Sequence, residues 1–481
     1  MKVRNVALLS CAGMLLTSAT VYSFAPSGLP AVALPSVPEI KPAVVVSDAV
    51  GASFEAPGTL HLEGRIGNAS LPAGGAGETF VLLEVKNEAG DQAKVSAPSH
   101  LALVIDRSGS MAGARLDNAI AGALAAVDRL AEGDMVSVVA FDTKPSVVVP
   151  ATEVSASSRG RIREAIRGIT LGGDTCISCG IEEAVSQFVA GSGKVHRMIL
   201  LSDGDATAGV RDVPGFRSIA QRARERGVSV STVGVGVSYN QKILGSIAQE
   251  AGGGHYFIED SRSLDRVFQA EADALRTTVA VNAEAEVELG PGVELVQVFD
   301  RSFQKRGQKV VVPLGSFTQG ETKTVLLKVR VPSRSEGLAK VAEVGLGFRD
   351  LVRGEDGRAG GKLGLMVSRD ATAAAELDGV VEGRVQRAET AAALLAANDL
   401  AERGKLDEAQ QRLASRQREL SSAAARARQA APAKRGRDVE EDFKGQSSSL
   451  DEANRSFDKN APKKPDVAVR RNQEMANPFM K

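Results

Sequence analysis

Residues 101–110, LALVIDRSGS, decide the fold of the middle of the chain. An unbroken apolar run ends abruptly in Asp106, and a short polar loop follows it. Continuous apolar runs of this kind are typical of strands buried on both faces, as in a parallel sheet covered by helices. In such sheets ligands bind at the carboxyl ends of the strands, which is where the polar loop lies. The stretch therefore predicts an α/β fold and the edge of the sheet at which a functional site belongs.

The sequence on either side of this strand continues the same pattern. Further apolar strands are expected at 135–141, 197–201, 229–235 and 255–258, and amphipathic helices at 116–130, 157–169, 180–189, 216–226 and 241–250, with a last helix from about 263. Strands that alternate with helices form a doubly wound, mainly parallel sheet with helices on both faces. We therefore predict one α/β domain over residues 98–276.

Two β-rich segments flank this domain. Residues 55–97 hold short alternating runs separated by Gly-rich turns, and residues 277–368 hold a longer series of alternating strands punctuated by Gly and Pro. The second pattern predicts an antiparallel β-sandwich. One hypothesis is that the two segments pair with each other and that the α/β domain is inserted between them.

The C-terminal region begins with a helical composition and ends in a polar tail. Residues 371–430 are rich in Ala, Glu, Arg, Gln and Leu at helical spacing, and Gly404 interrupts them where a helix would end. This pattern predicts a helical hairpin. Residues 431–481 contain few apolar residues and mixed charges, so we expect a disordered tail there.

The N-terminus has the form of a targeting segment. Lys2 and Arg4 precede an apolar run, so residues 1–25 predict a signal peptide, or a signal anchor if the run is not cleaved. A lipoprotein signal ending at Cys11 is a further alternative, for which the preceding apolar run is too short. The Pro-rich residues 26–54 are expected to be a linker. We therefore expect the protein in the periplasm, in the cell envelope or at the cell surface, with membrane contact only through an N-terminal anchor.

The composition narrows the class of function. The 481 residues contain 59 Lys and Arg against 59 Asp and Glu, and this zero net charge excludes a general nucleic-acid binder, which needs a positive surplus. Aromatic residues make up only 4%, with no Trp, so stacking platforms for sugars or bases are not expected. The sequence contains no nucleophile elbow, Walker A loop or His-Glu-x-x-His motif, so we do not expect an enzyme.

Three loops at the ends of predicted strands carry oxygen donors. Asp106, Ser108 and Ser110 follow the first strand, Thr175 ends a Gly-rich loop, and Asp203 follows a later strand. Because the carboxyl ends of parallel strands share one edge, we expect these side chains to converge. Carboxylate and hydroxyl oxygens suit a small hard divalent cation, most simply Mg²⁺, with Mn²⁺ and Ca²⁺ as alternatives. An open coordination position on such an ion would attract a carboxylate from a partner. The competing interpretation is an ordinary turn or helix cap.

These three pieces together resemble a von Willebrand factor type A (VWA) domain. The likeness covers roughly residues 99–276 and rests on Asp-x-Ser-x-Ser, the Gly-rich Thr loop and Asp-Gly, in the expected order on the expected elements. In that family the five side chains form the metal-ion-dependent adhesion site, which grips an acidic residue of a protein partner. Asp174 stands where a Gly often precedes the Thr, and Cys176 stands where a polar residue often follows it. The wider layout resembles bacterial cell-envelope proteins of this family.

The pair Cys176 and Cys179 is next to the proposed site. The interpretations are a small structural disulfide, a redox-sensitive clip on the loop that carries Thr175, or free thiols. Functionally, the leading hypothesis is a secreted or envelope-anchored module that binds an acidic partner residue through the cation. The alternatives are an envelope assembly or chaperone-like factor that recruits clients through the same domain, and a metallohydrolase, for which a base and a second metal site are missing.

Overall fold

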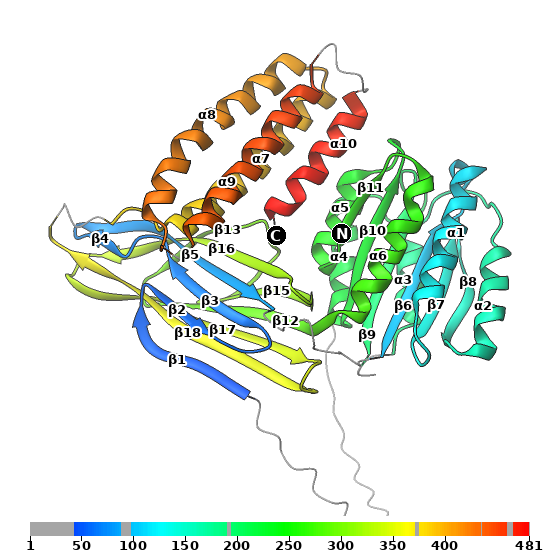
Figure 1. Ribbon diagram of the computed structural model, residues 1–481, viewed down its shortest axis with the longest axis horizontal. Coiled ribbons are helices and arrows are strands. Elements are labelled where there is room, and N and C mark those ends of the chain that lie inside the picture. Colours follow the sequence, from blue (N-terminus) through cyan, green and yellow to red (C-terminus); the bar gives the residue numbers. More distant parts are fainter. Residues whose placement is uncertain are drawn as a thin grey trace, which may run out of the picture. The chain divides into compact units, whose positions relative to one another are not determined.

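The computed structural model describes residues 43–87, 98–189, 194–370, 375–433, 435–458 and 465–480. These residues form three sheets and several groups of helices (Figure 1). The expected signal segment at residues 1–25 lies outside the described residues, as does the part of the expected linker up to residue 42.

The α/β part is built on a six-stranded sheet. In spatial order its strands are β11 (His255–Ile258), β10 (Val228–Val235), β9 (Val195–Ser202), β6 (Ser99–Asp106), β7 (Met135–Phe141) and β8 (Pro145–Glu153). All neighbouring pairs are parallel except β7 and β8, which are antiparallel. The helices are α1 (Ala114–Arg129), α2 (Ala156–Arg167), α3 (Ile177–Ser186), α4 (Val213–Glu225), α5 (Gln241–Ala251) and α6 (Leu264–Arg276). The predicted doubly wound fold is confirmed.

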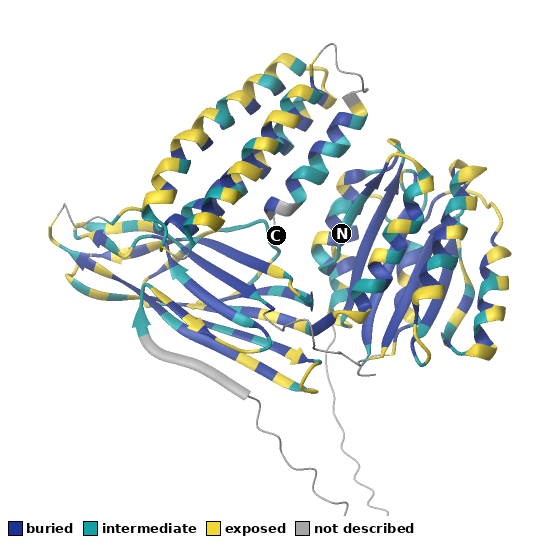
Figure 2. Ribbon diagram, in the orientation of Figure 1, coloured by how far each residue is buried: buried dark blue, intermediate teal, exposed yellow. Residues whose placement is uncertain are grey.

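The burial of β6 explains why its sequence is continuously apolar. Leu101, Leu103 and Ile105 pack in one cluster with α1, α2 and α6, whereas Ala102 and Val104 pack in a second cluster with α3, α4 and α5. Because successive side chains of a strand point to opposite faces, both faces must be apolar when helices cover both. Figure 2 shows these strands as buried ribbons between helices that are exposed on their outer faces.

The two β-rich segments form one sandwich. Its five-stranded sheet runs β13 (Glu294–Phe299), β16 (Thr322–Ser333), β5 (Gly75–Lys86), β3 (His61–Ile66) and β2 (Ser53–Ala56). Its seven-stranded sheet runs β1 (Ala43–Gly51), β18 (Glu355–Ser368), β17 (Gly337–Asp350), β12 (Thr278–Leu289), β15 (Lys309–Thr318) and β14 (Gln304–Arg306), and β4 (Ser70–Pro72) also pairs with β18. Since β5 precedes the α/β part and pairs with β16 after it, the hypothesis of an inserted α/β domain is confirmed.

The expectation of a linker over residues 26–54 is wrong at its C-terminal end. Strand β1 and the start of β2 lie within that range. The prolines that argued for a linker stop at Pro42, and β2 continues with the alternating burial of a strand, with Phe54 and Ala56 in the sandwich core. An edge strand such as β2 needs only a short segment of alternating buried and exposed residues. The dense prolines before this segment led to its prediction as part of the linker.

The helical hairpin is present and is extended by further helices. Helix α7 (Gly379–Glu402) and helix α8 (Leu406–Ala430) are separated at Gly404, whose φ of +75° is the left-handed conformation typical of a residue just after a helix. The expectation that residues 431–481 are disordered is wrong for α9 (Gly436–Ser456) and α10 (Pro465–Ala476).

The apolar residues of α9 explain this error. They are few, but Val439, Phe443, Leu450 and Ala453 are spaced so that they lie on one face of the helix, and all are buried. They join the core of the helical region with residues of α7 and α8. A low average content of apolar residues hides a narrow stripe of this kind, although one stripe is enough to dock a helix.

Candidate metal centre

The sheet places the two aspartates of the candidate site next to each other. Strand β6 ends at Asp106, and its neighbour β9 ends at Ser202, directly before Asp203. The two strands are parallel and pair Ile105 with Leu201, so their last residues reach the same edge. The side chains that follow both strands therefore meet where ligands bind in sheets of this type.

Hydrogen bonds connect four of the five predicted residues. Asp106 accepts the backbone N–H of Ser108 on Oδ1, at 2.8 Å. Ser108 Oγ lies 3.1 Å from Ser110 Oγ, and Ser110 Oγ donates to Asp203 Oδ1 at 2.6 Å. The remaining oxygen of Asp106, Oδ2, accepts from Ser202 Oγ at 2.6 Å. The convergence that the sequence predicted is therefore present for Asp106, Ser108, Ser110 and Asp203.

Thr175 is brought to the site by backbone contacts of its loop. The N–H of Gly172 donates to the carbonyl of Arg107 at 2.7 Å, and the N–H of Gly109 donates to the carbonyl of Gly173 at 3.1 Å. These bonds hold the Thr175 loop against the loop that follows β6. The loop also packs against Asp142, which follows β7: a Cβ on Gly172 would lie 1.7 Å from a carboxylate oxygen of Asp142, so this position has no room for a side chain.

A second contact fixes Thr175 itself. Its N–H donates to Thr207 Oγ1 at 2.8 Å, and its carbonyl accepts from the N–H groups of Thr207 and Ala208. Residues 207 and 208 lie in the loop after Asp203, so Thr175 joins the second and third loops of the site. Thr175 is buried, and the hydrogen bonds that position it run through its backbone.

The electrostatics of the site favour a cation. Asp106 and Asp203 are both fully buried, whereas Ser110 is exposed. Burial raises the pKa of Asp106 to about 6, against the hydrogen bonds from Ser108 and Ser202 that lower it, and the charge of Asp203 raises it further. Two neighbouring carboxylates removed from water are costly to ionise together, and a bound cation would offset that cost.

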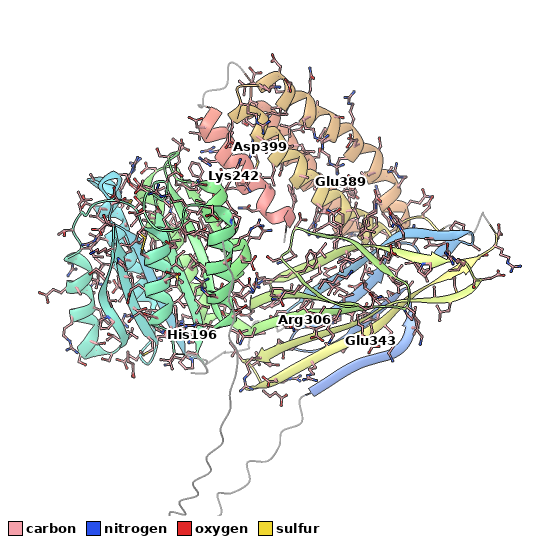
Figure 3. All side chains as sticks on the ribbon, turned by 180° about the vertical axis from the view of Figure 1, so that it is seen from behind. His196, Lys242, Arg306, Glu343, Glu389 and Asp399 are labelled. Carbon is pink, nitrogen blue, oxygen red and sulfur yellow. A yellow bond between two sulfur atoms is a disulfide. The ribbon has the colours of Figure 1, made fainter. Side chains whose placement is uncertain are left out.

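The donor set fits a small hard divalent ion. The five side chains offer carboxylate and hydroxyl oxygens, which Mg²⁺ accepts while it retains some water. Within the residues that the structure describes, no group of three or more His, Cys, Asp or Glu gathers into a site of zinc or calcium-cage type. His196, labelled in Figure 3, lies at the beginning of β9, at the opposite end of that strand from Ser202, so it does not belong to the site.

Two residues of this centre were not predicted. Ser202 binds Asp106, and its place directly before Asp203 at a strand end was the available signal. Arg115 donates from Nη1 to Asp203 Oδ2 at 2.5 Å and to the carbonyl of Ser110 at 3.0 Å. A lone arginine in the first turn of a helix gives no such signal, because charged residues are common there.

The two departures from the family pattern have different places in the structure. Asp174 is exposed, and its backbone N–H donates to Thr143 Oγ1 at 3.0 Å. Cys176 and Cys179 form a disulfide across the first turn of α3. Of the three interpretations of the cysteine pair, the structure shows the disulfide.

Comparisons with known proteins agree with this geometry. Residues 100–270 match the family model of the von Willebrand factor type A domain. The chain is 28% identical over 277 residues to the uncharacterized protein YfbK of Escherichia coli (strain K12). This match covers 55% of this chain and 47% of YfbK. The chain is 27% identical over 269 residues to the uncharacterized protein sll0103 of Synechocystis sp., covering 54% of this chain and 63% of that protein. The matches thus span about half to two thirds of these relatives.

A solved structure extends the likeness beyond the matched domain. It is described as a von Willebrand factor type A protein from Catenulispora acidiphila, and it superposes with a TM-score of 0.65 at 19% identity. The superposition covers 83% of this chain and 92% of that one. At this identity the likeness concerns the fold alone.

Proposed function

We propose that the VWA domain formed by residues 100–270 binds a divalent cation, most simply Mg²⁺, and through it an acidic residue of a protein partner. VWA domains mediate protein–protein interactions and commonly bind a divalent metal. The ligands we assign are Asp106, Ser108, Ser110, Thr175 and Asp203. The β-sandwich and the helical region serve as scaffold or as additional contact surface.

The observation that carries this proposal is the hydrogen-bonded path from Asp106 through Ser108 and Ser110 to Asp203. Two loops that are far apart in the sequence present their oxygens to one another at the ligand-binding edge of the sheet. The two carboxylates are buried while Ser110 is exposed. An ion held here would therefore have protein ligands on its buried side and an open coordination position on its solvent side. An open position on an ion with few charged ligands attracts a carboxylate.

We propose binding rather than catalysis for this site. Arg115 is a charged side chain that contacts this cluster, through Asp203, and its guanidinium offers N–H donors but no acceptor, so it does not suit the role of a general base. The hydroxyls of Ser108 and Ser110 are engaged with each other and with Asp203, an arrangement that suits ligands more than nucleophiles.

We also propose that the protein acts outside the cytoplasm, in the periplasm, cell envelope or at the cell surface. Lys2, Arg4 and the apolar run after them have the form of a secretory signal. The disulfide between Cys176 and Cys179 is of the kind that persists in oxidising compartments. Among the residues that the structure describes, no helix is long and apolar enough to cross a membrane.

Affinity capture from envelope extract tests the proposed function. The full chain and its Asp106→Ala variant serve as baits, each in Mg²⁺ and in chelator, and the captured proteins are identified by mass spectrometry. We expect partners that are captured by the wild type only in Mg²⁺ and not at all by the variant. The control bait is Asp205→Ala, which removes a nearby but exposed carboxylate. Equal capture in Mg²⁺ and in chelator would contradict the proposal.

A further inference from the structure

Arg115 already supplies a positive charge to the candidate metal centre. It lies in the first turn of α1, and its Nη1 is 2.5 Å from Asp203 Oδ2 and 3.0 Å from the carbonyl oxygen of Ser110. Asp203 is fully buried, whereas the Arg115 side chain is 41% exposed. The guanidinium therefore covers the buried carboxylate from the solvent side, where an incoming ion would enter.

Two glycines with a positive φ lie close to Arg115. Gly113 has a φ of +74°, which lets the chain turn sharply into α1 just before Arg115. Gly236, at the end of β10, has a φ of +72°, and a Cβ placed on it would lie 3.6 Å from Arg115 Nη2. The guanidinium thus lies between the loop of Ser110 and the end of a neighbouring strand, with one side towards solvent.

We infer that Arg115 is a tethered counter-cation that competes with the metal for Asp203 and thereby makes the site selective for divalent ions. The inference rests on the proposed function, because it concerns the same ligands. A cation that approaches Ser110 and Asp203 meets the positive charge of Arg115 and must displace it, since like charges at such short range repel strongly. The exposed side of the guanidinium gives it room to move away.

Only a doubly charged ion gains enough from two carboxylates to replace the arginine. A monovalent ion such as Na⁺ brings the same charge as Arg115 and forms no bidentate or charge-assisted hydrogen bonds of its own, so exchanging one for the other gains little. Arg115 is therefore a specificity-determining residue: it keeps Asp203 neutralised in a solution rich in monovalent salt and yields to a divalent ion.

Manganese binding by the full chain tests this inference without any partner. Metal-free wild type and Arg115→Gln are titrated with Mn²⁺ while electron paramagnetic resonance measures the unbound ion. Loss of a hydrogen bond between charged groups corresponds to roughly a tenfold to hundredfold change in affinity, so we expect Arg115→Gln to bind Mn²⁺ more tightly by about that factor. Arg129→Gln is the matched control, because Arg129 ends the same helix in an exposed ion pair with Asp273.

A salt exchange tests the selectivity. Replacing tetramethylammonium chloride with NaCl at the same ionic strength should weaken Mn²⁺ binding to Arg115→Gln and leave the wild type almost unchanged. Metal-free Arg115→Gln should also unfold at a lower temperature than the wild type, because Asp203 stays buried without a counter-charge, and Mn²⁺ should remove this difference.

The outcomes separate this inference from the proposed function. Equal or weaker Mn²⁺ binding by Arg115→Gln overturns the role of Arg115 and leaves the metal site standing. Binding by the variant but not by the wild type supports the competition and contradicts cation-dependent function of the natural chain. Binding by neither protein overturns both.

Discussion

Replacing Asp106 with Asn should stabilise the protein in the absence of metal and abolish its stabilisation by metal. Asp106 is fully buried, and burial raises its pKa to about 6 from a reference value of 3.8. Since the folded state then holds the proton more tightly than the unfolded state, the contribution of this group to stability is present at low pH and is lost as the pH rises through 6. At about pH 7.5 the ionised carboxylate costs the metal-free protein up to about 3 kcal/mol.

Asn removes this cost at little expense in hydrogen bonds. Its carbonyl oxygen can accept the N–H of Ser108, and its amide group can donate to Ser202 Oγ, so both contacts of Asp106 are kept. With Mg²⁺ at about one hundred times its dissociation constant, the wild type should gain about 2.7 kcal/mol, whereas Asp106→Asn should gain nothing. The difference in the free energy of unfolding between the two proteins should therefore become small when Mg²⁺ is added.

Hydrogen exchange measured by mass spectrometry on the full chain gives the required free energies. Peptides from β6 and β9 report the opening of the α/β domain alone, which avoids the difficulty that a chain of several parts does not unfold in one step. Asp205→Asn is the matched control, since that carboxylate is exposed. Slower exchange in the metal-free wild type than in Asp106→Asn, or equal protection of both proteins by Mg²⁺, would refute the reasoning.

Three further predictions concern the surroundings of the site. In Gly172→Ala the new Cβ would lie 1.7 Å from a neighbouring carboxylate oxygen, so we expect calorimetry to show weaker Mg²⁺ binding by a folded protein, whereas Gly160→Ala, with no atom within 4 Å of its Cβ, should bind normally. Replacing Cys176 and Cys179 together by Ser should lower the local stability of α3 by about 2 kcal/mol, measured by hydrogen exchange, and an unchanged value would show that the disulfide is not stabilising. Burial lowers the pKa of His100 to about 4, so its contribution to stability is lost as the pH falls below 6.5. His100→Gln should reduce this loss between pH 7 and pH 5 by about 2 kcal/mol, measured by hydrogen exchange of β6 peptides, and an equal loss in both proteins would contradict this cause.

The α/β fold and the convergence of four of the five candidate ligands could be predicted from local sequence. A strand that is buried on both faces carries apolar residues at every position, and residues 101–105 show this pattern. The pattern predicts a central strand of a sheet covered by helices. The parallel topology places the polar residues that follow such strands, which is why Asp106 and Asp203 lie at the same edge of the sheet.

The remaining features depend on contacts that local sequence does not encode. Arg115 donates to Asp203, which lies 88 positions away along the chain, and nothing near Arg115 in the sequence indicates that partner. Helix α9 is stable because other helices cover its narrow apolar stripe, and β2 because the sandwich core receives Phe54. In each case the stabilising contact comes from another element, and the segments of α9 and β2 taken alone resemble a polar tail and a Pro-rich linker.

Calorimetric titration of the metal-free full chain with Mg²⁺, in parallel with Asp106→Ala, tests the central claim most directly. The account predicts one ion bound per chain of the wild type and none by the variant, whose folding is checked by circular dichroism. Binding of Mg²⁺ to both proteins with equal affinity would contradict the account, because the ion would then lie elsewhere. No binding to the wild type would also contradict it, and the five proposed ligands would then form ordinary turns at the end of the sheet.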